Sequence, residues 1–90
     1  MHYHLRRSKK VLAQMERLPG HIRQRAKRLI NDLAYNPRPT YAEELTGILA
    51  GRYKICIDDH RIVYAIDDEI ITVEILKIGH KYGPEFYRDL

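Results

Sequence analysis

The residues that first suggest chemistry are three cations, Arg52, Lys54 and Arg61. Arg52 and Lys54 are two residues apart in a segment typical of a strand, so their side chains point to the same side. A two-residue turn at 59–60 would pair Asp58 with Arg61 and bring Arg61 onto that side as well. Grouped like charges are unfavourable unless an anion neutralises them, and they lower the pKa of a lysine toward values useful for proton transfer. The group therefore suggests a phosphate-binding site.

The same three cations also have an ordinary interpretation. Each could be a solvated sheet residue that forms an ion pair with Asp58, Asp59 or Glu74. Spacing alone favours this interpretation, because scattered basic residues are common on sheets. The pattern by itself therefore does not establish a site.

The charge of the chain is unevenly distributed. Residues 1–40 contain ten Lys and Arg and two acidic residues, whereas residues 41–90 contain six and ten. A basic half suggests a polyanion or an acidic partner, although a solvated helix surface gives the same count. The basic segment 23–28 is open to all three interpretations: solvent, RNA or an acidic partner segment.

Several classes of protein are disfavoured by composition. Cys56 is the only cysteine, which excludes an intramolecular disulfide and a zinc site built from several thiolates. The longest apolar run, at 62–66, is far too short to span a bilayer, and no apolar signal region begins the chain. His2 and His4 lack a third ligand at a recognisable spacing. We therefore expect a cytoplasmic protein without membrane contact, metal or cofactor.

The hydrophobic pattern predicts the elements that must position the three cations. Alternation predicts strands and a period near 3.6 predicts helices. The expected elements are a strand at 1–6, a helix at 9–18 capped by Ser8, a longer helix from 22 to a stop at 36–37, a connection with one helical turn at 38–51, and strands at 52–58, 61–66 and 70–78. We predict one α+β domain over residues 1–90, with two N-terminal helices packed on one face of a small, mainly antiparallel four-stranded sheet.

Five successive blocks of the sequence resemble a known family. They are INDLAYNP at 30–37, LTG at 45–47, GRYKI at 51–55, DHRIVYAI at 59–66 and IGHK at 78–81. No single block is specific, but their order, their spacing and the short length of the chain resemble the RelE/ParE superfamily of toxins. The resemblance covers nearly the whole chain and implies a RelE-like fold.

The resemblance implies a toxin from a type II toxin–antitoxin system. The RelE branch of this superfamily cuts messenger RNA in the ribosomal A site without a metal. A ribose 2′-hydroxyl attacks the adjacent phosphate, and the 5′-oxygen leaves. This reaction requires stabilisation of negative charge on the phosphorane, together with a proton acceptor and a proton donor.

The matching blocks place the family's active-site positions on five residues of this chain. Lys54 is the candidate base, Arg61 would clamp the phosphate, and Arg52 would add positive field. Lys81 would stabilise the transition state or the leaving oxygen, and Tyr87 would stack on a base or exchange a proton. By the same resemblance, these residues form the catalytic group, with Arg52 as an RNA-binding member.

Four residues near the end of the resemblance depart from the family pattern or leave a role open. Active relatives often have arginine where this chain has Lys81, and lysine cannot offer the same bidentate grip. Tyr82 competes with Tyr87 for one role. His80 is a further candidate for RNA binding or for proton transfer, since imidazole titrates near neutrality.

Two other functions remain open beside the ribonuclease. ParE-branch relatives bind and poison DNA gyrase without cutting RNA, although that branch generally lacks the full cationic set of Arg52, Lys54 and Arg61. A catalytically weak relative that only binds its antitoxin is the third possibility. For any of the three, the resemblance implies a hetero-oligomer with a cognate, RelB-like antitoxin that carries an acidic segment. The ribonuclease would also bind mRNA on the ribosome.

Overall fold

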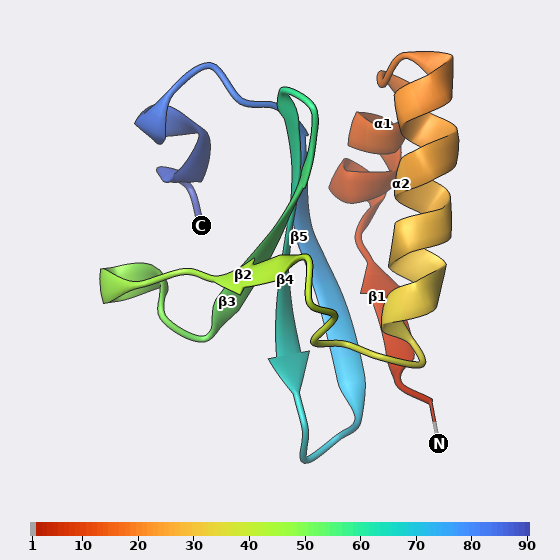
Figure 1. Cartoon of the computed structure of the whole chain (residues 1–90), viewed down its shortest axis with the longest axis vertical. Helices are drawn as coiled ribbons and strands as arrows, with labels where there is room; N and C mark the ends of the chain where they lie inside the picture. Colours follow the sequence, from red (N-terminus) through yellow and green to blue (C-terminus); the bar gives the residue numbers. More distant parts are fainter. Residues whose placement is uncertain (1) are drawn as a thin grey trace.

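The computed structural model describes residues 2–90, which form a five-stranded sheet with two helices on one face (Figure 1). The elements are β1 (His4–Arg7), α1 (Lys9–Glu16), α2 (Gly20–Leu33), β2 (Ala42–Glu44), the 3-10 helix η1 (Gly47–Leu49), β3 (Arg52–Ile57), β4 (His60–Asp67), β5 (Thr72–His80) and the 3-10 helix η2 (Pro84–Tyr87). Met1, where the predicted first strand begins, lies outside the described residues. No helix within residues 2–90 is long and apolar enough to cross a membrane.

The sheet has the strand order β1-β5-β4-β3-β2, with β1 parallel to β5 and the other neighbours antiparallel. This confirms the predicted α+β fold, but the sheet has five strands rather than four. The additional strand, β2, lies in the segment 38–51 that was predicted to be a connection. Its sequence is Ala-Glu-Glu, and glutamate and alanine are poor strand formers, so the pattern does not indicate it. The single helical turn expected there is present as η1.

The two helices lie against the sheet because each has an apolar stripe. Ser8 caps α1 as predicted, since its side chain accepts a hydrogen bond from the Val11 N–H at 3.1 Å. Leu12, expected on the same stripe, is instead about half exposed. The core comprises Val11, Met15 and Leu18, then Ile22, Ala26, Ile30 and Leu33 from α2, and Ile55, Ile57, Ile62, Tyr64, Val73, Ile75 and Ile78 from the sheet.

The β3–β4 hairpin has a different register from the predicted one. Its turn is formed by 58–59 rather than 59–60, so that Ile57 pairs with His60 and Cys56 with Arg61. Asp58 has a φ of 54°, a left-handed conformation that aspartate tolerates better than most residues. The pairing differs from the prediction by two residues, and side chains alternate with a period of two. Arg61 therefore still lies on the side of the sheet predicted for it.

An irregularity in the β4–β5 pairing changes which side chains of β5 face the helices. Val63 pairs with Lys77 and Tyr64 with Ile75, which leaves Leu76 as an additional residue. Before it, the odd-numbered residue Ile75 is in the core; after it, the even-numbered Ile78 is. Lys77 therefore lies on the open face of the sheet, although simple alternation would place it with Ile75.

Tyr64 is fully buried, and its hydroxyl donates a hydrogen bond to the Pro37 carbonyl at 2.8 Å. Burial raises the pKa of this hydroxyl well above its ordinary value. We expect Tyr64→Phe to lower the free energy of unfolding by about 1–2 kcal/mol, because the Pro37 carbonyl would lose its partner. Urea denaturation measures this loss, and Tyr35→Phe at an exposed position is the matched control. Equal stability of the two variants would contradict the structural role of this hydrogen bond.

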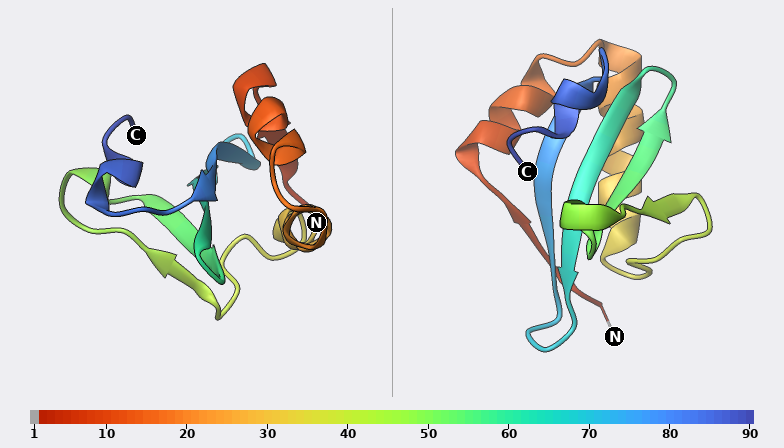
Figure 2. Two further views of the ribbon diagram at one scale, coloured as in Figure 1. Left: turned by 90° about the horizontal axis from the view of Figure 1, so that it is seen from above. Right: turned by 90° about the vertical axis from the view of Figure 1, so that its left-hand side faces the viewer.

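The face of the sheet opposite the helices is partly covered by two other segments. Figure 2 shows η1 and the C-terminal segment containing η2 on that side, away from α1 and α2. The space between them leaves part of β3 and β4 accessible. We call this side the open face.

Candidate active site

Three of the predicted site residues share the open face. Arg52 and Lys54 on β3 have the same side-chain direction, and Arg61 on β4 pairs with Cys56, two residues beyond Lys54. All three cations are half-buried. Lys54 and Arg61 are diagonal neighbours across the hairpin, a relation in which residues are roughly 7–8 Å apart, and Arg52 lies two residues further along β3. The structure therefore places all three cations on one face of the sheet, as the alternation predicted.

The guanidinium of Arg61 is held against the β3–β4 turn. Its Nη1 donates hydrogen bonds to the backbone carbonyls of Asp58 at 2.9 Å and His60 at 2.8 Å. Its Nε is buried and has no partner within residues 2–90. Two carbonyls thus fix the orientation of the fork, while part of its donor capacity is left for an anion.

Lys54 has an acidic neighbour that was not among the expected ones. Its Nζ lies 3.9 Å from Glu43 Oε2, its cross-strand partner on β2. The Glu43 side chain is 71% exposed, so water screens the pair and its contribution to stability is under about 1 kcal/mol. Of the three cations, Lys54 is thus the one with an ion pair among the described residues, and its partner is Glu43 rather than Asp58, Asp59 or Glu74.

The C-terminal segment brings Lys81 and Tyr87 together. Lys81 Nζ lies 5.6 Å from the centre of the Tyr87 ring, within the range of a cation–π interaction. The Tyr87 hydroxyl is buried and has no partner within residues 2–90. Tyr82, the competing tyrosine, is 83% exposed and stacks edge-on against His80 instead. Between the two tyrosines, Tyr87 is the one beside Lys81.

Lys77, which the sequence analysis missed, anchors this segment. Its Nζ donates hydrogen bonds to the Phe86 carbonyl at 2.7 Å and to Asp89 at 3.1 Å, and lies 4.5 Å from the centre of the Phe86 ring. The hydrogen bond from Lys77 lowers the pKa of Asp89. Phe86 is buried against Gly79, where a Cβ atom would lie 3.7 Å from the ring. Lys77 and Phe86 therefore hold η2, and with it Tyr87, on the open face.

His80 lies apart from the cations. It pairs with His60 at the end of the sheet, and the register places both on the side that the helices cover. Desolvation acts to raise the pKa of the Asp59 carboxyl. The hydrogen bond with His80 Nε2, at 2.8 Å, acts in the opposite direction, and the net effect is a lowered pKa. His60 Nδ1 is 2.9 Å from the same carboxylate without hydrogen-bond geometry. Of the expected RNA-binding residues, only Arg52 therefore lies on the open face, whereas His80 and Tyr82 form a neighbouring cluster.

Buried polar atoms without partners are concentrated at this end of the molecule. Within residues 2–90 they are His60 Nδ1, Arg61 Nε, His80 Nδ1 and the Tyr87 hydroxyl. A buried polar group without a partner costs about 1–3 kcal/mol, so four in one region require an explanation. A bound polar ligand would supply the missing partners for those that it reaches.

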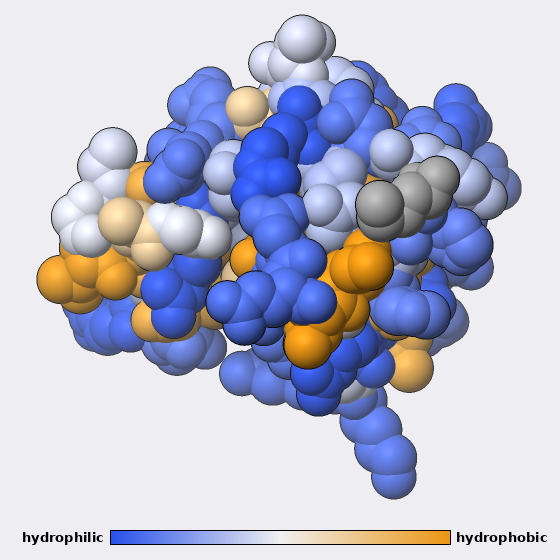
Figure 3. Space-filling view, turned by 90° about the horizontal axis from the view of Figure 1, so that it is seen from below, coloured by the Kyte–Doolittle hydropathy of each residue, from blue (hydrophilic) through white to orange (hydrophobic). Residues whose placement is uncertain are grey.

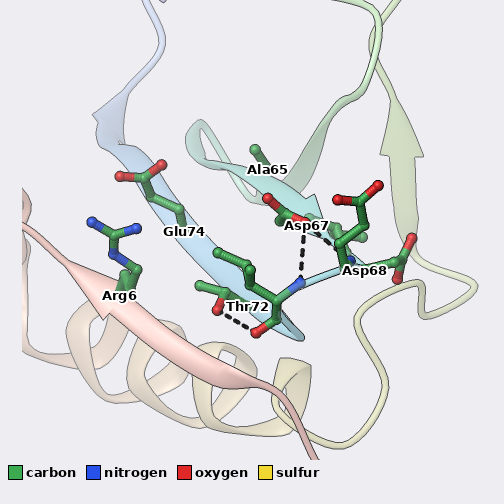
Figure 4. A pocket seen from close by; sticks show the side chains of 9 residues that line it. Arg6, Ala65, Asp67, Asp68, Thr72 and Glu74 are labelled. Atoms are coloured by element: carbon green, nitrogen blue, oxygen red, sulfur yellow. Dashed lines mark hydrogen bonds between the residues drawn. The ribbon is translucent and has the colours of Figure 1, made fainter.

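A cavity of about 680 Å³ lies at the opposite end, beside the β4–β5 turn (Figure 4). Its walls contain Asp67, Asp68, Glu69 and Glu74 against a single cation, Arg6. Asp67 accepts hydrogen bonds from the Glu69 and Ile70 N–H groups, which confirms that this acidic segment forms a turn. The surface at this end is mostly hydrophilic, with small separate apolar areas (Figure 3). Its negative charge makes it unsuitable for a phosphate.

No group of three or more His, Cys, Asp and Glu side chains that could hold a metal ion occurs in the described part of the chain. The chemistry available on the open face is therefore that of cations, an amine and a phenol. Such groups bind a phosphate, stabilise added negative charge on it and exchange protons.

A family model matches most of the chain. Residues 5–82 match the model described as the ParE toxin of a type II toxin–antitoxin system, parDE. The chain belongs to the RelE/ParE family of toxins. It is thus a toxin of a type II toxin–antitoxin system, which confirms the resemblance found in the sequence. No curated protein matches the chain in sequence.

Solved structures of RelE toxins are similar to this RelE/ParE chain over most of its length. The toxin–antitoxin complex RelBE2 from Mycobacterium tuberculosis contains a chain 28% identical, with a TM-score of 0.77, and the match covers 90% of this chain and 100% of that one. A mutant of the E. coli toxin RelE in the free state is 25% identical, with a TM-score of 0.79 and coverage of 98% and 93%. The YoeB/ParE toxin from Agrobacterium tumefaciens, 20% identical over 88% and 99% of the chains with a TM-score of 0.76, shares the fold.

Proposed function

We propose that this toxin is a ribosome-dependent, metal-independent endoribonuclease that cleaves mRNA and stops translation. One observation carries the proposal. The open face and the segment that covers it hold all five candidate residues, Arg52, Lys54, Arg61, Lys81 and Tyr87. Buried polar atoms that lack partners lie beside them. Five such groups around one surface fit a phosphodiester better than any neutral ligand.

In the proposed reaction the ribose 2′-oxygen forms a bond to phosphorus, and the bond from phosphorus to the 5′-oxygen breaks. Arg61 binds the phosphate, since the turn carbonyls already orient its fork. Arg52 adds positive charge from the same face. Lys81 stabilises the transition state or the leaving oxygen, and Tyr87 stacks on a base or exchanges a proton.

Lys54 is the proposed base that takes the 2′-hydroxyl proton. Lys54 shares its face of the sheet with Arg52 and Arg61, and Glu43 is its acidic neighbour. Because Glu43 is exposed and 3.9 Å away, RNA that binds to the open face can displace it. With Glu43 displaced, the Lys54 amine would face the bound phosphate, on the side of the sheet that carries Arg52 and Arg61.

The proposal extends to partners and location. The RelE relatives from M. tuberculosis and E. coli are described in complexes with antitoxins, RelBE2 and RelBE. We propose that a cognate RelB-like antitoxin with an acidic segment forms a hetero-oligomer with this chain in the cytoplasm. The exposed arginines and lysine of α2 offer a basic surface for that segment or for ribosomal RNA.

Gyrase poisoning is the second candidate function, and the match to a ParE model is the observation that favours it. A translation reaction with and without the toxin distinguishes the two, with primer extension on the mRNA and gyrase supercoiling assayed in parallel. New cuts at ribosome-occupied codons support the ribonuclease. Intact mRNA with inhibited supercoiling would assign the chain to the gyrase-binding branch, and no effect in either assay would leave a toxin that binds only its antitoxin.

Cys56 provides a chemical test of where the RNA binds. This exposed thiol is opposite Arg61 and on the same face as Lys54. Iodoacetate would add a negative charge beside the phosphate site, and we expect it to reduce cleavage about tenfold or more. Iodoacetamide adds a neutral group of similar size and should inhibit less, and Cys56→Ser should resist both reagents. Undiminished cleavage by fully carboxymethylated protein would contradict RNA binding on the open face.

A further inference from the structure

A second cavity, of about 500 Å³, lies beside the open face at the free upper edge of β5. Strand β1 pairs with β5 only as far as Ile75, so the edge beyond it has no neighbouring strand. The end of α1 and the C-terminal segment form the other walls. A volume of this size is typical of small-molecule sites, which span about 300–1,000 Å³.

The walls of this cavity combine an apolar floor with polar groups at its rim. Leu18, Ile78 and Phe86 are buried and supply the floor. Tyr82 extends from the rim, with its ring centre 4.6 Å from that of His80. Flat apolar walls next to an exposed aromatic ring are suited to a planar aromatic ligand, which can stack on the ring.

The hydrogen-bonding groups of the cavity include donors at the end of α1 and the carboxylate of Glu85 in η2. The Ile78 N–H donates to Gln14 Oε1 at 3.0 Å, which fixes the orientation of this amide and leaves its NH₂ group as a donor. Arg17 at the end of α1 adds a guanidinium, which has donors only. A matching ligand must therefore present acceptors to Gln14 and Arg17, and a donor wherever it reaches the Glu85 carboxylate.

The cavity is also close to the phosphate site. Gly79, which lines it, is the direct cross-strand partner of Arg61. Neighbouring strands lie about 4.7–4.9 Å apart, so the mouth of the cavity and the proposed phosphate clamp are one strand apart. A nucleotide whose phosphate is bound by Arg61 has its own base, or the base of the adjacent nucleotide, within reach of the cavity.

We propose that this cavity is a base-binding subsite, which takes one nucleobase of the RNA next to the phosphate that is cut. The inference rests on the proposed ribonuclease function and deepens it. Arg17 and Gln14 favour guanine, because its O6 and N7 are adjacent acceptors. Adenine presents only one acceptor, N7, beside a donor on that edge, so it cannot accept hydrogen bonds there from both Arg17 and Gln14.

Direct binding is the first test. The full-length, ¹⁵N-labelled protein is titrated with the 5′-monophosphates of guanosine, adenosine, cytidine and uridine. We expect GMP to shift the amide resonances of Ile78, Gly79 and His80 and to bind at least about threefold more tightly than AMP. Arg17→Gln combined with Tyr82→Ala should weaken GMP binding at least about tenfold.

The matched control is the pair Arg7→Gln and Tyr35→Ala. It removes the same charge and the same ring from exposed positions that do not line the cavity, and GMP should bind to it as to the wild type. Shifts confined to other surfaces, or equal GMP affinity in the two double variants, would overturn the proposal.

The second test compares cut sites in the translation reaction. The Arg17→Gln, Tyr82→Ala protein should cut at least about tenfold more slowly than wild type and lose the base preference at one position beside the cut. Cleavage with unchanged rate and preference would overturn the subsite and leave the ribonuclease proposal intact. Nucleotide binding in the cavity without RNA cleavage by the wild type would instead remove the ribonuclease proposal and leave a nucleotide-binding cavity.

Discussion

Arg61→Ala is expected to reduce mRNA cleavage at least about 100-fold. This corresponds to about 2–3 kcal/mol of lost transition-state stabilisation, the amount typical for removing one donor group from a preorganised anion site. The fork of Arg61 is oriented by the carbonyls of Asp58 and His60, so no other side chain of the open face can replace it. Primer extension on the mRNA of a translation reaction measures the loss.

Two controls separate catalysis from folding in this experiment. The same two hydrogen bonds stabilise the β3–β4 turn, so the unfolding curve of Arg61→Ala must be recorded beside its activity. Arg61→Lys keeps the charge but not the fork, and we expect an intermediate rate. Cleavage at the wild-type rate by folded Arg61→Ala would remove Arg61 from the proposed mechanism.

Lys77→Met is expected to release the C-terminal segment from the open face. The substitution keeps a long apolar chain against Phe86 but removes the hydrogen bonds to the Phe86 carbonyl and to Asp89. Hydrogen bonds from a charged donor contribute about 1.5–3 kcal/mol each, more than a short 3-10 helix can replace. We expect cleavage to fall about tenfold or more, because Tyr87 would no longer be fixed beside Lys81.

Hydrogen exchange detects this release directly. The amides of Phe86, Arg88 and Leu90 are hydrogen-bonded within the segment and should exchange faster in Lys77→Met, whereas those of the core strands should not. Lys10→Met is the matched control: Lys10 also contacts Asp89, at 3.5 Å, but both groups are largely exposed. Equal exchange in the two variants would show that Lys77 does not anchor the segment.

Local patterns in the sequence were sufficient to predict most of the fold. The apolar stripes of the helices and the alternation in β3 and β4 arise from burial against one core, and burial is what the periodicities report. Strand β2 lacks such a pattern, because only three residues pair at an edge of the sheet. Because the prediction lacked β2, it also did not predict that Glu43 lies close to Lys54, a contact that depends on the pairing of β2 with β3.

The site was predictable only as far as regular alternation holds. The predicted hairpin register differs from the observed one by two residues. A shift by an even number of residues leaves each side chain on the same face, so Arg52, Lys54 and Arg61 still share a face. Lys77 could not be assigned to the open face, because the additional residue at Leu76 reverses the alternation. His80 comes after that irregularity too. For this reason its closeness to Lys81 in the sequence did not predict on which side of the sheet the His80 side chain lies.

The parallel pairing of β1 with β5 limits when the protein can become active during its own synthesis. Residues 4–7 are made well before their partners at 72–75, so this pairing closes only after residue 75 has been made. Contacts between such distant parts of a chain form late in folding. Lys81 and Tyr87 are made later still. On the proposed ribonuclease function, the translation machinery is therefore not exposed to an active copy of this toxin until residues 4–87 of that copy have all been synthesised.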